Sequence, residues 1–227
     1  MAPLAPTKQM NIVFDFGAVL FTWQPGVLIH THFPQHATTP EKTAELAHAV
    51  FGHADWHNFD RGVLSAHEVS ARTAARLGLN EPGLRALVDG IAEHLQPMPD
   101  TLAVLAQLRA WRDQQPTQRH LYYLSNMPAP YARVLVQKHA FLGWFDGGIF
   151  SGDVHHIKPE PGIYALLETR YALQPSQTVF IDDLAANVAH AIARGWQGIR
   201  FESAAQLQAQ LWPVLSAARL LTDPLPA

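Results

Sequence analysis

The chain has 227 residues, of which 48% are hydrophobic, so it carries enough apolar material for a sizeable buried core. Its formal net charge is −3, with only 16 lysines and arginines, which excludes the basic surface that nucleic-acid binding requires. Cysteine is absent, which excludes disulfides, thiolate catalysis and zinc–thiolate sites and favours a cytoplasmic protein.

The ends of the chain show no targeting or membrane-spanning pattern. The first nine residues hold two prolines and no apolar core of a signal peptide, so we interpret them as a loose tail. We expect residues 222–227 to be frayed. No apolar run approaches the roughly 18 residues that span a bilayer. We therefore expect no membrane partner.

The first predicted strand, 11–16, carries one aspartate, Asp15, into a turn that contains Gly17. An apolar strand cannot solvate a carboxylate, so this acid must face a cleft, a cation or water at the strand's end. Nucleophilic and metal-binding aspartates are presented in this way, although a plain strand-end aspartate gives the same local pattern. The later segments decide between these interpretations.

The interval 22–96 contains no convincing strand and predicts three or four helices. Three helix starts are marked by N-cap residues, namely Thr39, Ser65 and Asn80. A helical block inserted after the first strand implies a small second domain. Such a domain would lie over the carboxyl ends of the strands, where open α/β sheets bind ligands.

The remainder of the chain alternates predicted helices with predicted strands. The helices are expected at 100–111, 131–139, 162–171 and 184–194, the first of them with Asp100 as its N-cap. The strands are expected at 120–125, 148–151, 178–182 and 197–201, the second being the weakest. All are interpreted as apolar on both faces, which predicts a mostly parallel α/β sheet covered by helices on both sides.

Two further polar groups follow strands of this predicted sheet. Ser125 and Asn126 end the second long strand, and both side chains can donate hydrogen bonds to an anion, although both residues also favour ordinary turns. Lys158 lies in a loop just before a helix, where its charge can reach a phosphate. A surface lysine is the alternative interpretation.

The last polar group is a pair of adjacent carboxylates, Asp182 and Asp183, at the end of a buried strand. Such a pair repels itself and usually needs a cation or a proton to persist. The pair therefore indicates a hard divalent ion held by oxygen ligands. A helix N-cap with one exposed acid is the alternative. Thirteen histidines are scattered without tight ligand spacing, so we predict no histidine metal site.

These four motifs, in this order, resemble those of the haloacid dehalogenase-like hydrolase superfamily over residues 11 to 201. The chain is most similar to a subgroup with Phe-Asp-x-Gly openings, Ser-Asn, Lys-Pro-Glu and Asp-Asp motifs, which includes phosphatases of sugar phosphates such as glucose 1-phosphate. The resemblance implies a Rossmann-like parallel sheet with helices on both faces and a small all-helical cap domain inserted after strand 1. We place the catalytic core at 8–21 and 97–216 and the cap at 22–96.

The resemblance also implies roles for the motif residues. Asp15 would be the nucleophile that forms an aspartyl-phosphate. Mg²⁺ would be held by the Asp15 carboxylate, the Gly17 carbonyl and Asp183, with Asp182 acting through water or another ligand. The phosphoryl oxygens would be held by three side chains, those of Ser125, Asn126 and Lys158. The expected partner is a small phosphate ester, and the chain is expected to be a monomer or a homodimer.

Gly17 departs from the family pattern, because most phosphatases of the family have a second aspartate there that protonates the leaving oxygen. A positioned acid contributes about 10²–10⁴-fold. Three interpretations stay open. The first is a phosphatase of substrates with easier leaving groups, such as anomeric sugar phosphates or acyl phosphates, with the proton supplied by a cap residue or water. The others are a metal-independent 2-haloacid dehalogenase that uses Asp15 and a silent phosphate-binding module. Phosphonate hydrolysis through a Schiff base is disfavoured, because the predicted cap has one lysine, Lys42.

The predicted cap offers residues for specificity and for the missing proton. Arg61 suits a phosphate or a sugar hydroxyl, with a surface ion pair as the alternative. Other residues that could line the cleft are Trp23, Trp56, Phe59 and Asp60, although tryptophan and phenylalanine in a helical cap more often form its core. Candidate proton donors are Thr22, His53 and His57. His155 stands where relatives often have a glycine, which puts the reach of Lys158 in question.

Overall fold

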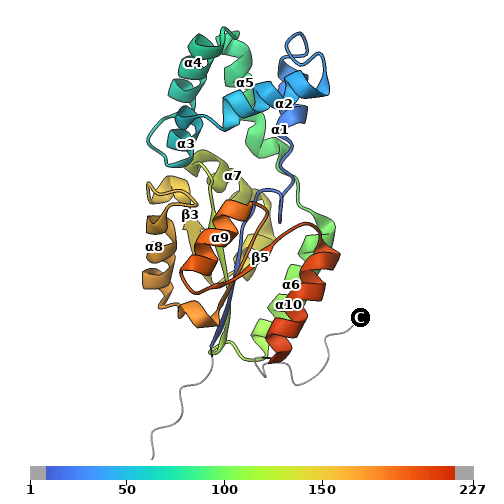
Figure 1. Cartoon of the computed structure of the whole chain (residues 1–227), viewed down its shortest axis with the longest axis vertical. Helices are drawn as coiled ribbons and strands as arrows, with labels where there is room; N and C mark the ends of the chain where they lie inside the picture. Colours follow the sequence, from blue (N-terminus) through green and yellow to red (C-terminus); the bar gives the residue numbers. More distant parts are fainter. Residues whose placement is uncertain (1–8, 218–227) are drawn as a thin grey trace, which may run out of the picture.

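A computed structural model describes residues 9–217 of the chain. Its centre is a parallel sheet of five strands in the order β3-β2-β1-β4-β5 (Figure 1). The strands are β1 (Met10–Phe14), β2 (Arg119–Ser125), β3 (Gly147–Phe150), β4 (Thr178–Asp182) and β5 (Gln197–Arg200). This arrangement confirms the predicted α/β class. The tail and the frayed end expected at 1–8 and 222–227 lie outside the described residues.

Helices cover both faces of the sheet, because alternate strand residues point to opposite sides. On one face, α6 (Pro99–Asp113), α7 (Ala129–Lys138) and α10 (Ala204–Ala217) pack on Ile12, Phe14 and their neighbours. On the other face, α8 (Pro161–Tyr171) and α9 (Ala185–Ala193) pack on Val13 and Phe180. Two separate apolar clusters result, one for each face.

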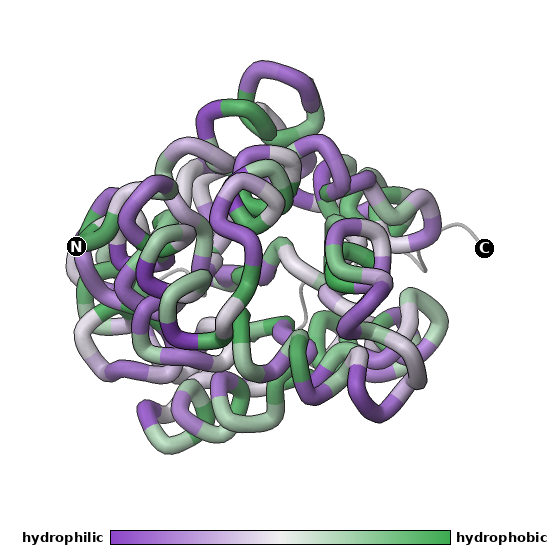
Figure 2. The backbone as a smooth tube through the Cα atoms, turned by 90° about the horizontal axis from the view of Figure 1, so that it is seen from above, coloured by the Kyte–Doolittle hydropathy of each residue, from purple (hydrophilic) through white to green (hydrophobic). Residues whose placement is uncertain are grey.

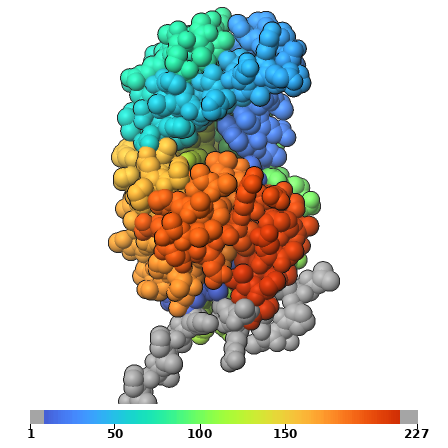
Figure 3. Space-filling model, in the orientation of Figure 1, coloured from blue at the N-terminus to red at the C-terminus, as the bar shows by residue number. Residues whose placement is uncertain are grey.

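The insertion after β1 forms a helical cap, which lies above the sheet in Figures 1 and 3. Its helices are α1 (Pro25–His32), α2 (Pro40–Phe51), α3 (Ala54–Asp60), α4 (Ala66–Leu77) and α5 (Glu81–His94). The sequence predicted three or four helices here, whereas the described cap has five. Viewed from above, the helical turns carry both hydrophilic and hydrophobic stretches, as amphipathic helices do (Figure 2).

Several local predictions of helix ends are confirmed and others are wrong. The side chain of Thr39 caps α2, and Ser65 forms a capping box with Glu68 at the start of α4. The N-cap of α6 is Met98 and not Asp100, because Pro99 already takes the first helical position.

The strand predicted at 197–201 ends at Arg200 as an edge strand, and within it only Ile199 is buried. It is therefore not covered on both faces as predicted. None of the helices in residues 9–217 is long and apolar enough to cross a membrane.

The two crossings between cap and sheet lie side by side. Thr22 donates its backbone N–H to the Gln96 carbonyl (2.8 Å), and Met98 donates to the Leu20 carbonyl (2.9 Å). The Thr22 hydroxyl also bonds to His94 and Gln96 across this pair of linkers. The cap is thus joined to the sheet through one paired double connection, which places it over the carboxyl ends of the strands.

Candidate active site

Asp15 follows the fully buried strand β1 and is itself only 7% exposed. Its backbone N–H donates to the Ile181 carbonyl of β4 (2.9 Å), so the sheet fixes its position. One carboxylate oxygen, Oδ1, accepts the backbone N–H of Phe16 (2.6 Å). The strand thus presents the acid at the carboxyl edge of the sheet.

Lys158 reaches this acid from the loop before α8. Its Nζ lies 2.8 Å from Oδ1 of Asp15 and 2.6 Å from Oδ2 of Asp182, and it is almost fully buried. His155 adopts a positive φ of 60°, the conformation that a glycine would favour. The histidine at this position therefore does not prevent the lysine from reaching the site.

Asp182 is the most completely bonded acid of the cluster. It has no solvent exposure, and besides Lys158 it accepts the Leu184 N–H (2.8 Å) and the Asn187 side-chain amide (3.0 Å to each oxygen). These bonds hold the turn between β4 and α9. Asp182 therefore fixes the lysine and the turn, and its neighbour Asp183 is half-buried with its carboxylate open to a further ligand.

The carboxylate oxygens of Asp15, Asp182 and Asp183 lie within 4.8 Å of one another. Burial raises the pKa of Asp15 to about 7, Lys158 opposes this rise, and the charges of Asp182 and Asp183 add to it. Burial and the charge of Asp182 also raise the pKa of Asp183. Burial alone would lower the pKa of Lys158, but the two carboxylates outweigh it and the pKa is raised.

Three carboxylates thus share one ammonium group, which leaves negative charge uncompensated in a buried place. All the free donors are oxygens, which are the ligands that Mg²⁺ prefers. The residues therefore fit a hard divalent cation, with the carboxylates of Asp15 and Asp183 as donors.

Ser125 and Asn126, the predicted anion-binding pair at the end of β2, differ in their hydrogen bonds. Within residues 9–217 the buried Ser125 hydroxyl makes no hydrogen bond, so it is free to donate. The Asn126 side chain accepts the Lys158 N–H (2.7 Å) and donates to the Lys158 carbonyl (3.0 Å). Asn126 therefore positions the lysine loop and retains only one amide hydrogen for an anion.

Gly17 has room for a side chain but holds no acid. A Cβ built on it would meet only the Cβ of Trp23, at 3.9 Å. Trp23 is half-buried, whereas Trp56 and Phe59 are buried in the core of the cap. Those two aromatic residues therefore belong to the core of the cap, as the favoured interpretation of the sequence expects.

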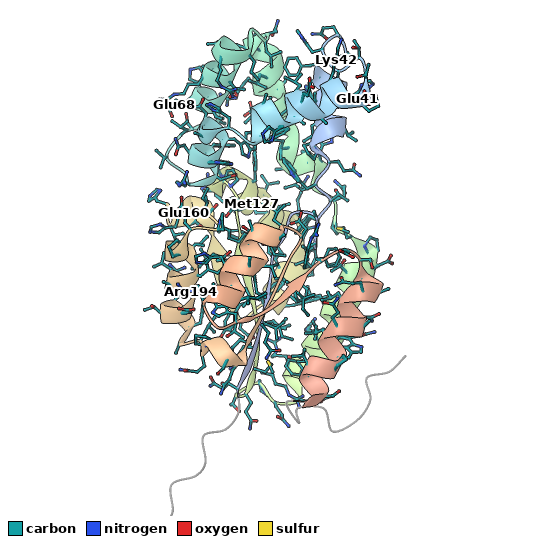
Figure 4. All side chains as sticks on the ribbon, viewed as in Figure 1. Glu41, Lys42, Glu68, Met127, Glu160 and Arg194 are labelled. Carbon is teal, nitrogen blue, oxygen red and sulfur yellow. The ribbon has the colours of Figure 1, made fainter. Side chains whose placement is uncertain are left out.

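Arg61 is engaged with the sheet domain. Its guanidinium forms an ion pair with Glu160 and bonds to Asn58 (3.3 Å), and its carbonyl lies 2.8 Å from Nδ1 of His155. Figure 4 shows Glu160 just below the cap. We call the contacts among Arg61, Glu160 and His155 the cap latch. The ion-pair interpretation of Arg61 thus has a specific partner from the Lys-Pro-Glu motif.

The candidate proton donors in the cap are otherwise occupied. Thr22 belongs to the linker pair, and Nδ1 of His53 accepts the Asp55 N–H at the start of α3 (3.1 Å). Burial lowers the pKa of His57, and Arg61 lowers it further, so its imidazole is neutral near pH 7. None of these three residues is placed as an available acid.

Sequence reasoning missed the contributions of Ser151, Glu160 and Asn187. Ser151 links the loop after β3 to the cap, Glu160 receives Arg61, and Asn187 holds Asp182. Each forms its bond with a residue from another element. Glu160 belongs to the Lys-Pro-Glu motif and Asn187 lies only five residues after Asp182, so for these two the signal is the motif itself. For Ser151 the local pattern carries none.

Comparison with known proteins agrees with this geometry. The model of the haloacid dehalogenase-like hydrolase family matches residues 25–195. A sesquiterpene phosphatase of Aspergillus oryzae is 25% identical over 188 residues, which cover 82% of this chain and 87% of that protein.

Solved structures show the same fold. A HAD family enzyme of Bacteroides thetaiotaomicron, determined with magnesium and inorganic phosphate, matches with a TM-score of 0.64 at 18% identity and covers 86% of this chain and 94% of its own. The L-2-haloacid dehalogenase of Xanthobacter autotrophicus matches with a TM-score of 0.59 at 21% identity, covering 90% of this chain and 83% of its own.

Proposed function

Because the chain belongs to the haloacid dehalogenase-like hydrolase family, we propose that it is a magnesium-dependent phosphatase of small phosphate monoesters that uses Asp15 as its nucleophile. One observation carries the proposal: Lys158 bridges Asp15 and Asp182 at the sheet edge, and Asp183 lies beside them. This cluster combines a nucleophile, a fixed positive charge and oxygen donors for a cation. Phosphoryl transfer needs little more than such positioning and charge neutralisation.

In the proposed reaction the Asp15 carboxylate attacks phosphorus and the ester oxygen leaves. Lys158 and the free Ser125 hydroxyl hold the phosphoryl oxygens, while Asn126 keeps the lysine loop in place. Mg²⁺ held by Asp15, Asp183 and the Gly17 carbonyl would neutralise charge on the phosphoryl group and keep Asp15 ionised. Water then cleaves the aspartyl-phosphate and releases phosphate.

Two named relatives support this assignment. The sesquiterpene phosphatase of Aspergillus oryzae aligns over most of both chains. The Bacteroides enzyme, which shares the fold, was determined with magnesium and phosphate. Neither relative carries the proposal alone, since the acid–lysine cluster of this chain is what would perform the chemistry.

Two substrate classes follow from different observations. The motifs resemble those of sugar-phosphate phosphatases. The sesquiterpene phosphatase of Aspergillus oryzae favours an isoprenoid phosphate. A small hollow beside Trp23 has walls of both polar and apolar character, so it favours neither class. The hollow is lined by Thr22, Trp23, Gln24, Val27, Leu28, Ile91, His94 and Leu95.

The two alternative functions have less support. A metal-independent dehalogenase gains nothing from a second strand-end acid, yet Asp183 is kept beside Asp15. A silent binding module would have no need for a buried lysine shared between two acids. Chloride release from 2-chloropropionate in EDTA would support the first alternative, and inactivity on all phosphate esters would support the second.

A Mg²⁺-dependent screen of phosphate esters, with sugar phosphates and farnesyl phosphate among them, tests the proposal. We expect Asp15→Asn to abolish phosphate release and the acid-stable label left by ³²P substrate, whereas Asp113→Asn, at the exposed end of α6, retains both. Full activity of the Asp15→Asn protein would refute covalent catalysis. The better of the two substrate classes is read from kcat/KM.

A further inference from the structure

A phosphatase of alkyl or sugar phosphates must protonate the departing oxygen, and Gly17 offers no acid for this step. The cap candidates Thr22, His53 and His57 are engaged or neutral. One further acid of the cap, Asp60, is buried at the junction with the sheet. Its surroundings differ from those of the surface acids of the cap.

The end of α3 that carries Asp60 is fixed on the catalytic edge. The Asp60 carbonyl accepts the Ser151 hydroxyl (2.6 Å), and the same hydroxyl oxygen accepts the Met127 N–H (2.8 Å). Ser151 directly follows β3, and Met127 follows the Ser125-Asn126 pair. Gly62 has a φ of 71°, and a Cβ on it would overlap the Gly152 carbonyl, so the two backbones touch.

The Asp60 side chain has no partner among the described residues, and its carboxyl oxygens are not fully enclosed by protein. The residue is 8% exposed, and its side chain forms no hydrogen bond or ion pair with another part of the described chain. The neighbouring Arg61 turns its guanidinium to Glu160. A buried acid without a partner in the fold calls for an explanation, and a catalytic role is one such explanation.

The charged and titratable groups around Asp60 come from three elements. Arg61 follows it on its own helix, Lys158 and Asp15 act on it from the sheet edge, and the Tyr131 hydroxyl acts from α7. Burial raises the pKa of Asp60 to about 8, the charges of Arg61 and Lys158 oppose this rise, and Asp15 adds to it. The group is therefore mostly protonated at neutral pH, as a proton donor must be.

We propose that Asp60 is the acid that protonates the leaving oxygen, so that the cap supplies the group that position 17 lacks. The inference rests on the proposed phosphatase function. As the Asp15 oxygen bonds to phosphorus and the P–O bond to the alcohol breaks, the Asp60 proton passes to the departing oxygen. The Asp60 carboxylate then takes a proton from the water that attacks the aspartyl-phosphate, which restores the acid and frees Asp15.

The test measures leaving-group release in a single turnover with excess enzyme and Mg²⁺, so that hydrolysis of the aspartyl-phosphate does not enter. A series from 2,4-dinitrophenyl phosphate to alkyl phosphates varies the leaving-group pKa. For the wild type we expect a nearly flat dependence, because the departing oxygen is protonated. For Asp60→Asn we expect about a 10²–10⁴-fold loss on alkyl phosphates and less than about 10-fold on the dinitrophenyl ester.

The pH profile gives a second readout. Alkyl release by the wild type should fall as the pH rises through about 8, and this fall should be lost in Asp60→Asn. Asp55→Asn, which changes a cap acid paired with His53, Arg72 and Arg76, is the matched control and should keep the wild-type slope.

A steep dependence already in the wild type would overturn the inference without any variant, and an equal loss on all esters in Asp60→Asn would do so as well. Failure of the proposed function is distinguishable, because wild-type enzyme would then form no phosphorylated Asp15.

Discussion

The sheet edge and the junction between cap and sheet differ in whether their buried charged groups have partners. At the sheet edge, Lys158 bonds to two acids, and Asp182 is satisfied by a lysine, a backbone N–H and an amide. At the junction, Asp60 is buried with no partner in the described chain, and Arg61 is only half-buried in its ion pair with Glu160. The buried charges of Lys158 and Asp182 are therefore paired, whereas within residues 9–217 the Asp60 carboxyl is not.

This difference assigns separate tasks to the two regions. The ends of parallel strands position Asp15 and Asp183, and Asn126 holds the loop that carries Lys158. This arrangement suits a nucleophile and a cation site that must not move. The cap is held by the paired linkers, the cap latch, the bond of Ser151 to the Asp60 carbonyl and the contacts of α5 with α7, where the Tyr131 hydroxyl donates to the Val88 carbonyl (2.7 Å). A separate domain held by linkers and side-chain contacts suits substrate entry and the delivery of a proton.

The largest expected effect comes from Lys158→Met, which removes the ammonium group at the sheet edge. Two buried carboxylates then lose their ammonium partner, and removal of one member of a buried pair costs about 3–5 kcal/mol of unfolding free energy. We also expect phosphatase activity to fall about 10³-fold, because a donor to the phosphoryl oxygens is lost. Urea unfolding and kcat measure the two effects. Lys138→Met, which removes an exposed lysine of α7, is the control, and equal losses in both variants would contradict the prediction.

Replacement of the unpaired acid Asp60 is expected to raise the stability of the fold. The pKa of Asp60 is about 8 in the fold and near the ordinary aspartate value of 3.8 when unfolded, so the folded state binds the extra proton between these values. Stability therefore falls as pH rises through that window. We expect Asp60→Asn to be about 2–4 kcal/mol more stable than wild type at pH 7, with the difference vanishing near pH 4. Chemical unfolding at both pH values measures this, and a variant less stable at pH 7 would show that the carboxylate has a stabilising partner.

Substitutions of the neighbouring acids Asp182 and Asp183 should have different effects, one on the stability of the fold and the other on cation binding. We expect Asp183→Asn to weaken Mg²⁺ binding by at least about 10–100-fold, the range seen when even an outer partner of a metal site is removed. Asp182→Asn should instead lower the melting temperature, because Lys158 loses one of its two carboxylates. Calorimetric Mg²⁺ titration and thermal unfolding distinguish the two. The reverse assignment of effects would show that Asp182 is the direct ligand.

The same contrast explains what the sequence could predict. The acids and the lysine of the sheet edge follow strands, and the carboxyl ends of parallel strands share one edge, so local pattern predicts that Asp15, Lys158 and Asp183 meet. The parallel sheet was predictable from the alternation of strands and helices, and the capping box at Ser65 from residues three apart in the sequence, and both are confirmed.

The junction could not be predicted in this way. Arg61 and Glu160 are 99 residues apart, and Ser151 meets the Asp60 carbonyl over 91 residues. The helix that carries Asp60, α3, has only seven residues, too few for a clear apolar period. Burial of Asp60 likewise depends on how the cap docks. These properties arise from tertiary packing and not from local sequence.

The smallest expected effect concerns the cap latch. A double-mutant cycle of Arg61→Met and Glu160→Gln should give a coupling free energy of about 0.5–1 kcal/mol, because the pair is partly exposed and screened by salt. The exposed pair of Lys138 and Glu93, which also joins the cap to the sheet domain, is the matched control and should couple less strongly. Thermal unfolding at low and high salt measures both cycles. If the latch holds the end of α3 in place, its loss should also slow alkyl release more than dinitrophenyl release, since it shifts Asp60 and leaves Asp15 untouched. An equal slowing of both esters would mean that the latch supports the whole site and not the cap acid alone.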